Sequence, residues 1–196
     1  MKRHIRRIAL VGIVVMGIFV WGLAADSQAL HDQLLRLHVV GASDSKADQD
    51  VKLLVRDAVL RSLEQGLEDL TDPQEAYDYV QRMLPKVEAA ANRCLEAAGF
   101  SDTVAVSLTE EAFPTRAYDT FSLPAGIYEA LRITIGSGEG RNWWCVAFPP
   151  LCLGAAEAEA AAYFTPEETA LLKGQGGYVL KFRSMELLGQ LKGLLF

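Results

Sequence analysis

The stretch that most constrains the fold is residues 35–60, which read LRLHVVGASDSKADQDVKLLVRDAVL. Leu35, Leu37 and Val39 alternate with other residues, and this period of two predicts a strand. Gly41 ends the run, and Ser45 followed three residues later by Asp48 matches a loose capping box at a helix start. We therefore expect a buried strand, a tight polar junction and a long helix.

The expected helix has one apolar face and charged sides. Residues of the apolar face recur at spacings of three and four; they are Val51, Leu54, Val55, Ala58, Val59, Ser62 and Leu63. On the wetter sides, Asp48–Lys52 and Asp57–Arg61 have the i,i+4 spacing of ion pairs, each worth about 0.3 kcal/mol. This pattern predicts that Leu54 is buried and Lys52 solvated.

Later residues predict a second helix and three more strands. Asp72 and Pro73 start the helix, and Pro85 inside its pattern predicts a kink or a break. Strands are expected at residues 103–109, 127–135 and 142–148, the last being apolar on both faces, as in a central strand. The sequence GSGEG between the last two predicts a hairpin connection. The fold class is α+β, with a mixed or antiparallel sheet packed against two long N-terminal helices.

The N-terminal residues predict entry into a membrane. Four basic residues precede residues 8–25, which are uncharged and mostly apolar, as in a signal peptide or signal anchor. Small residues near the end of this run permit cleavage, so both outcomes stay open. The chain then divides into a tether (26–33), an α+β domain (34–153), a weakly structured alanine-rich segment with a short helix (154–177) and a C-terminal strand with an amphipathic helix (178–196).

Composition excludes some partners. The chain has 196 residues, of which 51% are apolar, enough for one domain plus appendages. Loss of residues 1–25 would change the formal net charge from −6 to −10. An acidic exported domain is a poor ligand for nucleic acid or for an anionic membrane surface. We expect no nucleic-acid partner, and membrane attachment only through residues 8–25 if these are not cleaved.

Known catalytic signatures are missing from the sequence, including GxSxG, HExxH, CxxC and the Walker lysine. His38 precedes Ser43 and Asp44 by a few residues, which leaves a hydrolase as an alternative. The competing interpretation is a histidine whose hydrogen bonds are satisfied at the edge of the sheet. We expect no catalytic residue, no metal and no cofactor.

Cysteines and tryptophans leave alternatives open. Cys145 and Cys152 flank VAFPPL, which is consistent with a disulfide in an exported protein or with two free thiols. Cys94 lies on an apolar helical face and is expected to be a buried thiol. Trp143 and Trp144 should point to opposite faces of their strand, so one is a core residue. The other is buried as well, or is an exposed anchor for a protein or a carbohydrate.

Two blocks of this sequence resemble the stage II sporulation protein R family of endospore-forming bacteria. The first is residues 35–60, and the second, residues 113–152, reads FPTRAYDTFSLPAGIYEALRITIGSGEGRNWWCVAFPPLC. The shared motifs are long: RLHV-x-x-x-SD, K-x-x-VRDAV, PAG-x-YEALR and G-x-G-x-NWWCV-x-FPPLC. The C-terminal region matches less well.

The resemblance implies a signalling role. Family members are exported from the forespore into the space between two membranes, where they switch on a membrane-embedded aspartic protease of the opposing membrane. That protease processes the pro-sigma-E factor. The resemblance implies no active site; it makes the matched polar positions candidate protease contacts, namely Ser43, Asp44, Arg116, Tyr118, Arg141, Asn142 and Trp143. The alternatives are an exported hydrolase acting on cell wall or peptide through His38, and a structural wall-binding module.

Overall fold

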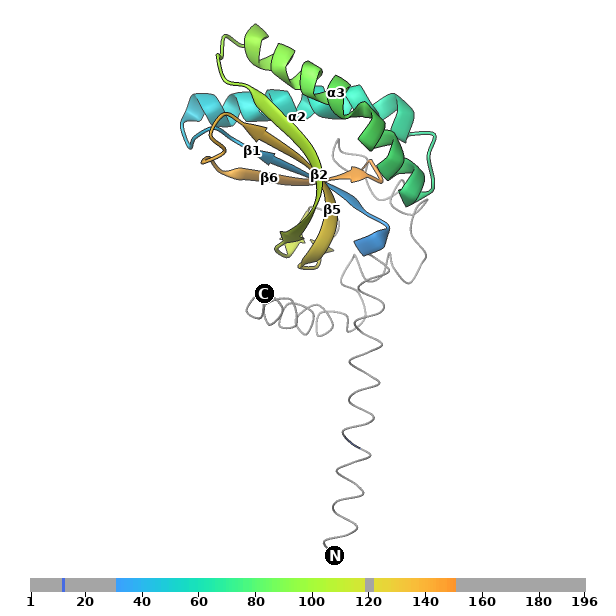
Figure 1. Ribbon diagram of the computed structural model, residues 1–196. Coiled ribbons are helices and arrows are strands. Elements are labelled where there is room, and N and C mark those ends of the chain that lie inside the picture. Colours follow the sequence, from blue (N-terminus) through green and yellow to red (C-terminus); the bar gives the residue numbers. More distant parts are fainter. Residues whose placement is uncertain (1–11, 13–30, 119–121, 151–196) are drawn as a thin grey trace, which may run out of the picture.

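Two long helices lie on one face of a four-stranded sheet in the computed structural model (Figure 1). The structure describes residue 12, residues 31–118 and residues 122–150. Its elements are β1 (Leu35–Val40), α2 (Lys46–Leu67), α3 (Pro73–Ala97), β2 (Val104–Phe113), β3 (Arg116–Ala117), β4 (Ser122–Leu123), β5 (Gly126–Ile135) and β6 (Asn142–Phe148). The predicted α+β class, with a mixed sheet and two helices, is confirmed.

Several expectations fall on residues outside these ranges. They include the signal or anchor segment, except for Gly12, the alanine-rich segment and the C-terminal α-β-α segment. In the part of the chain that the structure describes, no helix has the length and apolar content needed to cross a membrane. One end of the expected tether does lie within the described residues: His31 is buried and contacts the ring of Tyr128.

The strand order is β2-β5-β1-β6, with β1 parallel to β5 and antiparallel to β6. Three expectations about pairing were therefore wrong. β1 is interior, so His38 is not at a sheet edge; β6 is an outer strand among the described ones; and GSGEG joins two strands that β1 separates, so it is not a hairpin turn. Alternation and glycine content report the local chain direction but not which strands pair, which explains the errors.

Both long helices begin where the sequence predicts. The Ser45 side chain accepts a hydrogen bond from the amide of Asp48, and that of Asp72 accepts from the amides of Gln74 and Glu75. α3 continues through Pro85, so no break occurs there. Pro85 is exposed, and on the wet side of a helix water can satisfy the carbonyl that the proline leaves without a donor.

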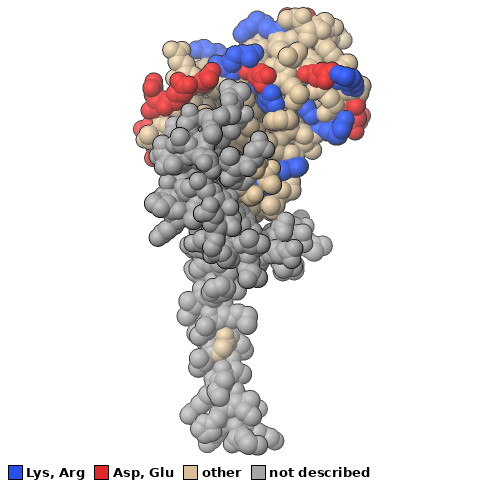
Figure 2. Space-filling view, turned by 180° about the vertical axis from the view of Figure 1, so that it is seen from behind, with Lys and Arg blue, Asp and Glu red and all other residues tan. Residues whose placement is uncertain are grey.

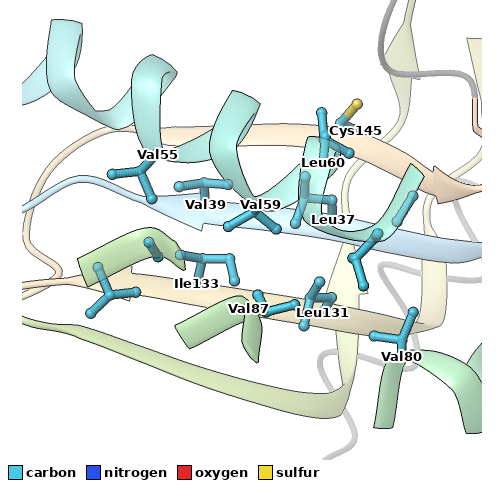
Figure 3. Packing of buried hydrophobic residues seen from close by; sticks show 14 of the residues in the cluster. Leu37, Val39, Val55, Val59, Leu60, Val80, Val87, Leu131, Ile133 and Cys145 are labelled. Carbon is cyan, nitrogen blue, oxygen red and sulfur yellow. The ribbon is translucent and has the colours of Figure 1, made fainter. Parts of the chain in front are cut away.

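The core lies between the helices and the sheet (Figure 3). Leu37 and Val39 of β1 and Leu131 and Ile133 of β5 project from the sheet into it, as expected. The helices contribute residues at the predicted spacing: Val51, Val55, Val59 and Leu63 from α2, and Ala76, Val80, Val87, Ala91 and Leu95 from α3.

The polar sides of α2 differ from expectation. Leu54 is 51% exposed whereas Lys52 is only 4% exposed, the reverse of what the apolar pattern predicts. Asp48 accepts a hydrogen bond from Ser43, and Asp57 pairs with Arg56 at 2.7 Å, so the predicted i,i+4 pairs do not form. Lys52 instead donates a hydrogen bond to the carbonyl of Arg141, in the loop between β5 and β6. A local sequence pattern does not indicate this contact.

Candidate functional site

The loop between β5 and β6 lies against the junction between β1 and α2. The amide of Gly140 donates to the carbonyl of Gly41 at 2.9 Å, and the Ser137 hydroxyl donates to the carbonyl of Ala42 at 2.9 Å. The backbone amide of Arg141 donates to Asp44 Oδ1 at 2.7 Å. The two segments of the resemblance, nearly a hundred residues apart in sequence, therefore form one surface.

The buried side chain of Lys52 links the two segments of this junction by hydrogen bonds. Its Nζ donates to the carbonyl of Arg141 at 2.8 Å and to Gln49 Oε1 at 2.6 Å, while Gln49 Nε2 donates to the carbonyl of Ser43 at 2.8 Å. Burial lowers the pKa of Lys52, and the charge of Arg141 lowers it further, while that of Asp44 raises it. These hydrogen bonds fix the backbone that carries the exposed side chains of Asp44 and Arg141. Arg141 Nε lies 3.5 Å from Asp44 Oδ1, and the two side chains are 70% and 64% exposed.

A second cluster lies on the sheet face opposite the helices. His38 Nδ1 lies 2.6 Å from Glu111 Oε2, and Glu111 Oε1 accepts from Arg132 at 2.7 Å. His38 Nε2 lies 3.0 Å from Asn142 Oδ1, and the imidazole stacks on Trp144 with 3.8 Å between ring centroids. These residues come from β1, β2, β5 and β6, so the whole sheet positions the cluster.

The chemistry of the His38 cluster is that of a closed network. Burial alone would raise the pKa of Glu111, but the bonds from Arg132 and His38 outweigh it and lower the pKa. Both ring nitrogens of His38 have partners, and the ring is 5% exposed. Ser43 bonds Asp48 and Asp44 bonds Arg141, so the His–Ser–Asp constellation considered for a hydrolase is not assembled.

Arg36, on the same face of β1, is a residue that sequence analysis did not single out. Its side chain is fully buried; Nε donates to the carbonyl of Cys145 at 2.9 Å and Nη2 donates to the Tyr118 hydroxyl at 3.0 Å. The guanidinium carbon lies 4.4 Å from the ring centre of Phe113 and 5.0 Å from that of Tyr128. Burial lowers the pKa of Arg36. The available signal was its place two residues before His38, which gives both side chains the same face.

Arg116 and Tyr118 border this buried guanidinium. Tyr118 accepts from Arg36 and donates to the carbonyl of Trp144 at 3.4 Å, and the Arg116 guanidinium lies 5.6 Å from the centre of the Trp144 ring. Arg116 is exposed. Arg116 and Tyr118, two of the predicted contact residues, thus lie together beside the sheet face.

Trp143 lies apart from the other predicted positions. It points to the helix side, is partly buried against the core, and has the Arg56 guanidinium 4.3 Å from its ring centre. The structure thus places Ser43, Asp44 and Arg141 at the junction, Arg116 and Tyr118 beside Arg36, and Asn142 beside His38. Cys145 is buried and Cys152 lies outside the described residues, so a disulfide between them stays a prediction. Cys94 is a free, half-buried thiol, less buried than expected.

Charge and metal-ligating residues add little to this picture. Acidic and basic side chains alternate over the described part of the face in Figure 2. Among residues 31–118 and 122–150, no three His, Cys, Asp or Glu side chains gather in a way that could hold a metal ion.

The fold defines a small α+β domain whose mixed sheet carries two helices on one face and polar clusters on the other and at the junction. The family model described as stage II sporulation protein R matches residues 31–158, more than half of the chain. The chain therefore belongs to this family.

A stage II sporulation protein R from Bacillus subtilis (strain 168) is 41% identical over 121 residues. The match covers 62% of this chain and 54% of that protein, so the chain spans about half the length of the curated relative. No solved structure matches this chain.

Proposed function

We propose that this protein is an exported sporulation signal that activates a membrane-embedded aspartic protease, the peptidase that processes the pro-sigma-E factor. Membership of the stage II sporulation protein R family carries the proposal. The protein would be made in the forespore and exported into the space between the membranes, either secreted or held by residues 8–25. The partner would lie in the opposing membrane.

Activation by binding is the mechanism we favour. A ligand shifts a conformational equilibrium only by its difference in affinity for the two states, so the protein must contact a surface that the active protease presents and the inactive one does not. The junction of β1 and α2 suits such a contact. Its backbone is fixed by Lys52 and Gln49, and Asp44 and Arg141 project into solvent. A preorganised surface loses little conformational entropy when it binds.

The proposal is tested by co-expression in a non-sporulating host. The host would contain the protease, its pro-sigma substrate and this protein with or without residues 1–25, and processing would be followed by loss of the pro-segment. Processing that requires both the protein and its export supports the proposal. Substrate that keeps its pro-segment despite confirmed export contradicts it.

The same assay tests the junction surface. We expect the double substitution Asp44→Ala and Arg141→Ala to lower processing about tenfold, which corresponds to roughly 1.4 kcal/mol of binding free energy. Stability should fall by about 1 kcal/mol, because both side chains are exposed but Asp44 also accepts the hydrogen bond from the amide of Arg141. The matched control is Lys46→Ala with Asp50→Ala, an exposed ion pair in α2 whose loss should leave processing unchanged. Equal loss in both variants would exclude a specific contact at the junction.

A hydrolase remains the second candidate because His38 and Glu111 form a histidine–carboxylate pair at 2.6 Å. That pair orients a general base in many enzymes. Release of soluble fragments from peptidoglycan by the purified full chain, and its loss in Glu111→Gln with the fold retained, would favour this candidate. An activator should release none. His38→Ala is a weaker test than Glu111→Gln, because the His38 ring is buried and bonds residues of two other strands.

A further inference from the structure

We propose that Arg36, together with Arg116 and Tyr118, forms a binding site for a carboxylate group. This carboxylate site is distinct from the junction surface, and the inference does not depend on the identity of the protease. It follows from a buried positive charge that the described part of the chain leaves without a counter-charge.

The first observation is the unfilled hydrogen-bonding capacity of Arg36. Nε and Nη2 have partners, whereas Nη1 is buried without one. Among the residues that the structure describes, no carboxylate pairs with Arg36. Buried guanidinium groups are usually paired, because removing the charge from water without a partner is costly.

The second observation is the positive charge around Arg36. The neighbouring charged group is Arg116, whose own charge disfavours a second cation nearby. Arg116 forms no ion pair within the described ranges, and its guanidinium lies over Trp144. By contrast, Arg132 on the same face is neutralised by Glu111 at 2.7 Å. The imbalance is therefore local to the Arg36 end of the sheet, where an anion would find two arginines.

The geometry favours a carboxylate over a larger or more highly charged anion. A planar guanidinium whose Nη1 is free can donate to the oxygens of a carboxylate along its Nη edge. Aromatic rings of Phe113 and Tyr128 line the guanidinium, and such a site tolerates one negative charge better than two. Arg116 is exposed and Tyr118 partly exposed, so a carboxylate that approaches from β3 meets these residues before Arg36.

The carboxylate has two sources: an acidic segment of a partner protein, or an acidic residue of this chain outside the described ranges. The test uses the full chain in detergent and the probe peptide acetyl-Gly-Glu-Gly-amide, with acetyl-Gly-Gln-Gly-amide as the uncharged control. The readout is the ¹⁵N–¹H resonance of Arg36 Nε, assigned by its disappearance in Arg36→Lys.

We expect the glutamate peptide to shift this resonance saturably and the glutamine peptide to leave it unchanged. Arg116→Gln should weaken binding about tenfold, whereas Arg93→Gln, the same charge change on an exposed position of α3, should not weaken it. Arg116 is exposed, so this variant folds even if a substitution of Arg36 does not.

The second arm identifies an internal source. In a variant whose acidic residues outside residues 31–118 and 122–150, Asp26 included, are changed to amides, an internal carboxylate would be lost. A shift of the Arg36 resonance in this variant, with peptide binding that the wild type lacks, supports the site and assigns the carboxylate to the chain itself. Binding by the wild type assigns it to a partner. The proposal is overturned if the glutamate peptide shifts the resonance in neither protein.

Discussion

Arg36, Lys52 and the Glu111 network show three ways in which this sheet accommodates charge. Lys52 donates hydrogen bonds to a backbone carbonyl and a side-chain amide oxygen, and Glu111 accepts hydrogen bonds from two side chains. Arg36 instead shares its charge with aromatic rings and keeps one nitrogen without an acceptor. Residues of the fold supply the hydrogen-bond partners of Lys52 and Glu111, whereas Arg36 Nη1 would gain its acceptor from the bound anion proposed above.

The Glu111 network should make stability depend on pH in acid. The pKa of Glu111 is lower in the folded state than its ordinary value of 4.5, so its stabilisation is present above the unfolded pKa and disappears as the pH falls through the folded pKa. We expect Glu111→Gln to lower the free energy of unfolding by about 1–3 kcal/mol at pH 7, because Arg132 and His38 lose their charged acceptor. Urea unfolding at pH 7 and between pH 3 and 5 measures this.

The gap between the wild type and Glu111→Gln should close in acid. Glu110→Gln is the matched control, because Glu110 is exposed on the same strand and should change stability little at any pH. A gap that stays constant down to pH 3 would mean that packing, rather than charge, accounts for the effect.

Gly140 is the residue on which the junction surface most directly depends. A Cβ at this position would lie 2.3 Å from the carbonyl oxygen of Ser43 and 2.9 Å from that of Gly41, both backbone atoms that cannot rotate away. We expect Gly140→Ala to destabilise the protein by about 1–3 kcal/mol, as overpacking does, and thermal unfolding measures the loss. Gly99→Ala is the control, since an added Cβ meets nothing within 4 Å there and only backbone strain remains, about 1 kcal/mol. Equal losses would show that the loop does not need this close approach.

At the scale of elements, the sequence predicted what depends on neighbours along the chain. Helix starts at Ser45 and Asp72 follow from caps that reach two or three residues forward. The burial of Lys52 could not be predicted in this way, because its acceptor is the carbonyl of Arg141. The junction surface was predicted as scattered positions in two motifs, and only the fold brings Asp44 to Arg141.

Pro85 provides a prediction about an element. α3 passes through this exposed proline, which has no amide to donate to the carbonyl four residues earlier. We expect Pro85→Ala to raise the free energy of unfolding by about 1–2 kcal/mol, since restoring the helical bond and removing the ring clash outweigh the proline's smaller unfolded-state entropy. Thermal unfolding with circular dichroism measures the change. Pro73→Ala is the control, because the first turn needs no such bond and no gain is expected. A loss of stability in Pro85→Ala would mean that the proline ring contributes packing.

At the scale of the whole molecule, pairing between distant segments determines the site. β1 lies between β5 and β6, so residues near the start of the domain and residues near its end form adjacent strands. The sequence patterns identified all three strands but not this order, because neither a period of two nor an apolar run carries information about partners. Arg36 was missed for the same reason. Its burial comes from Phe113, Tyr118, Tyr128 and Cys145, four residues on later parts of the chain.

This topology predicts that the sheet and the helices unfold together. Ile133 is fully buried at the centre of β5, and Ile127 is 56% exposed near its start, so the same substitution can be compared on one strand. We expect Ile133→Ala to lower the free energy of unfolding by about 2–5 kcal/mol and Ile127→Ala by no more than about 0.5 kcal/mol. Native-state hydrogen exchange should show the Ile133→Ala loss equally at slow amides of β1, β5 and α3, because the core joins them. A loss confined to β5 would instead show that the strands open one at a time. The His38 cluster, which all four strands build, would then open independently of the helices.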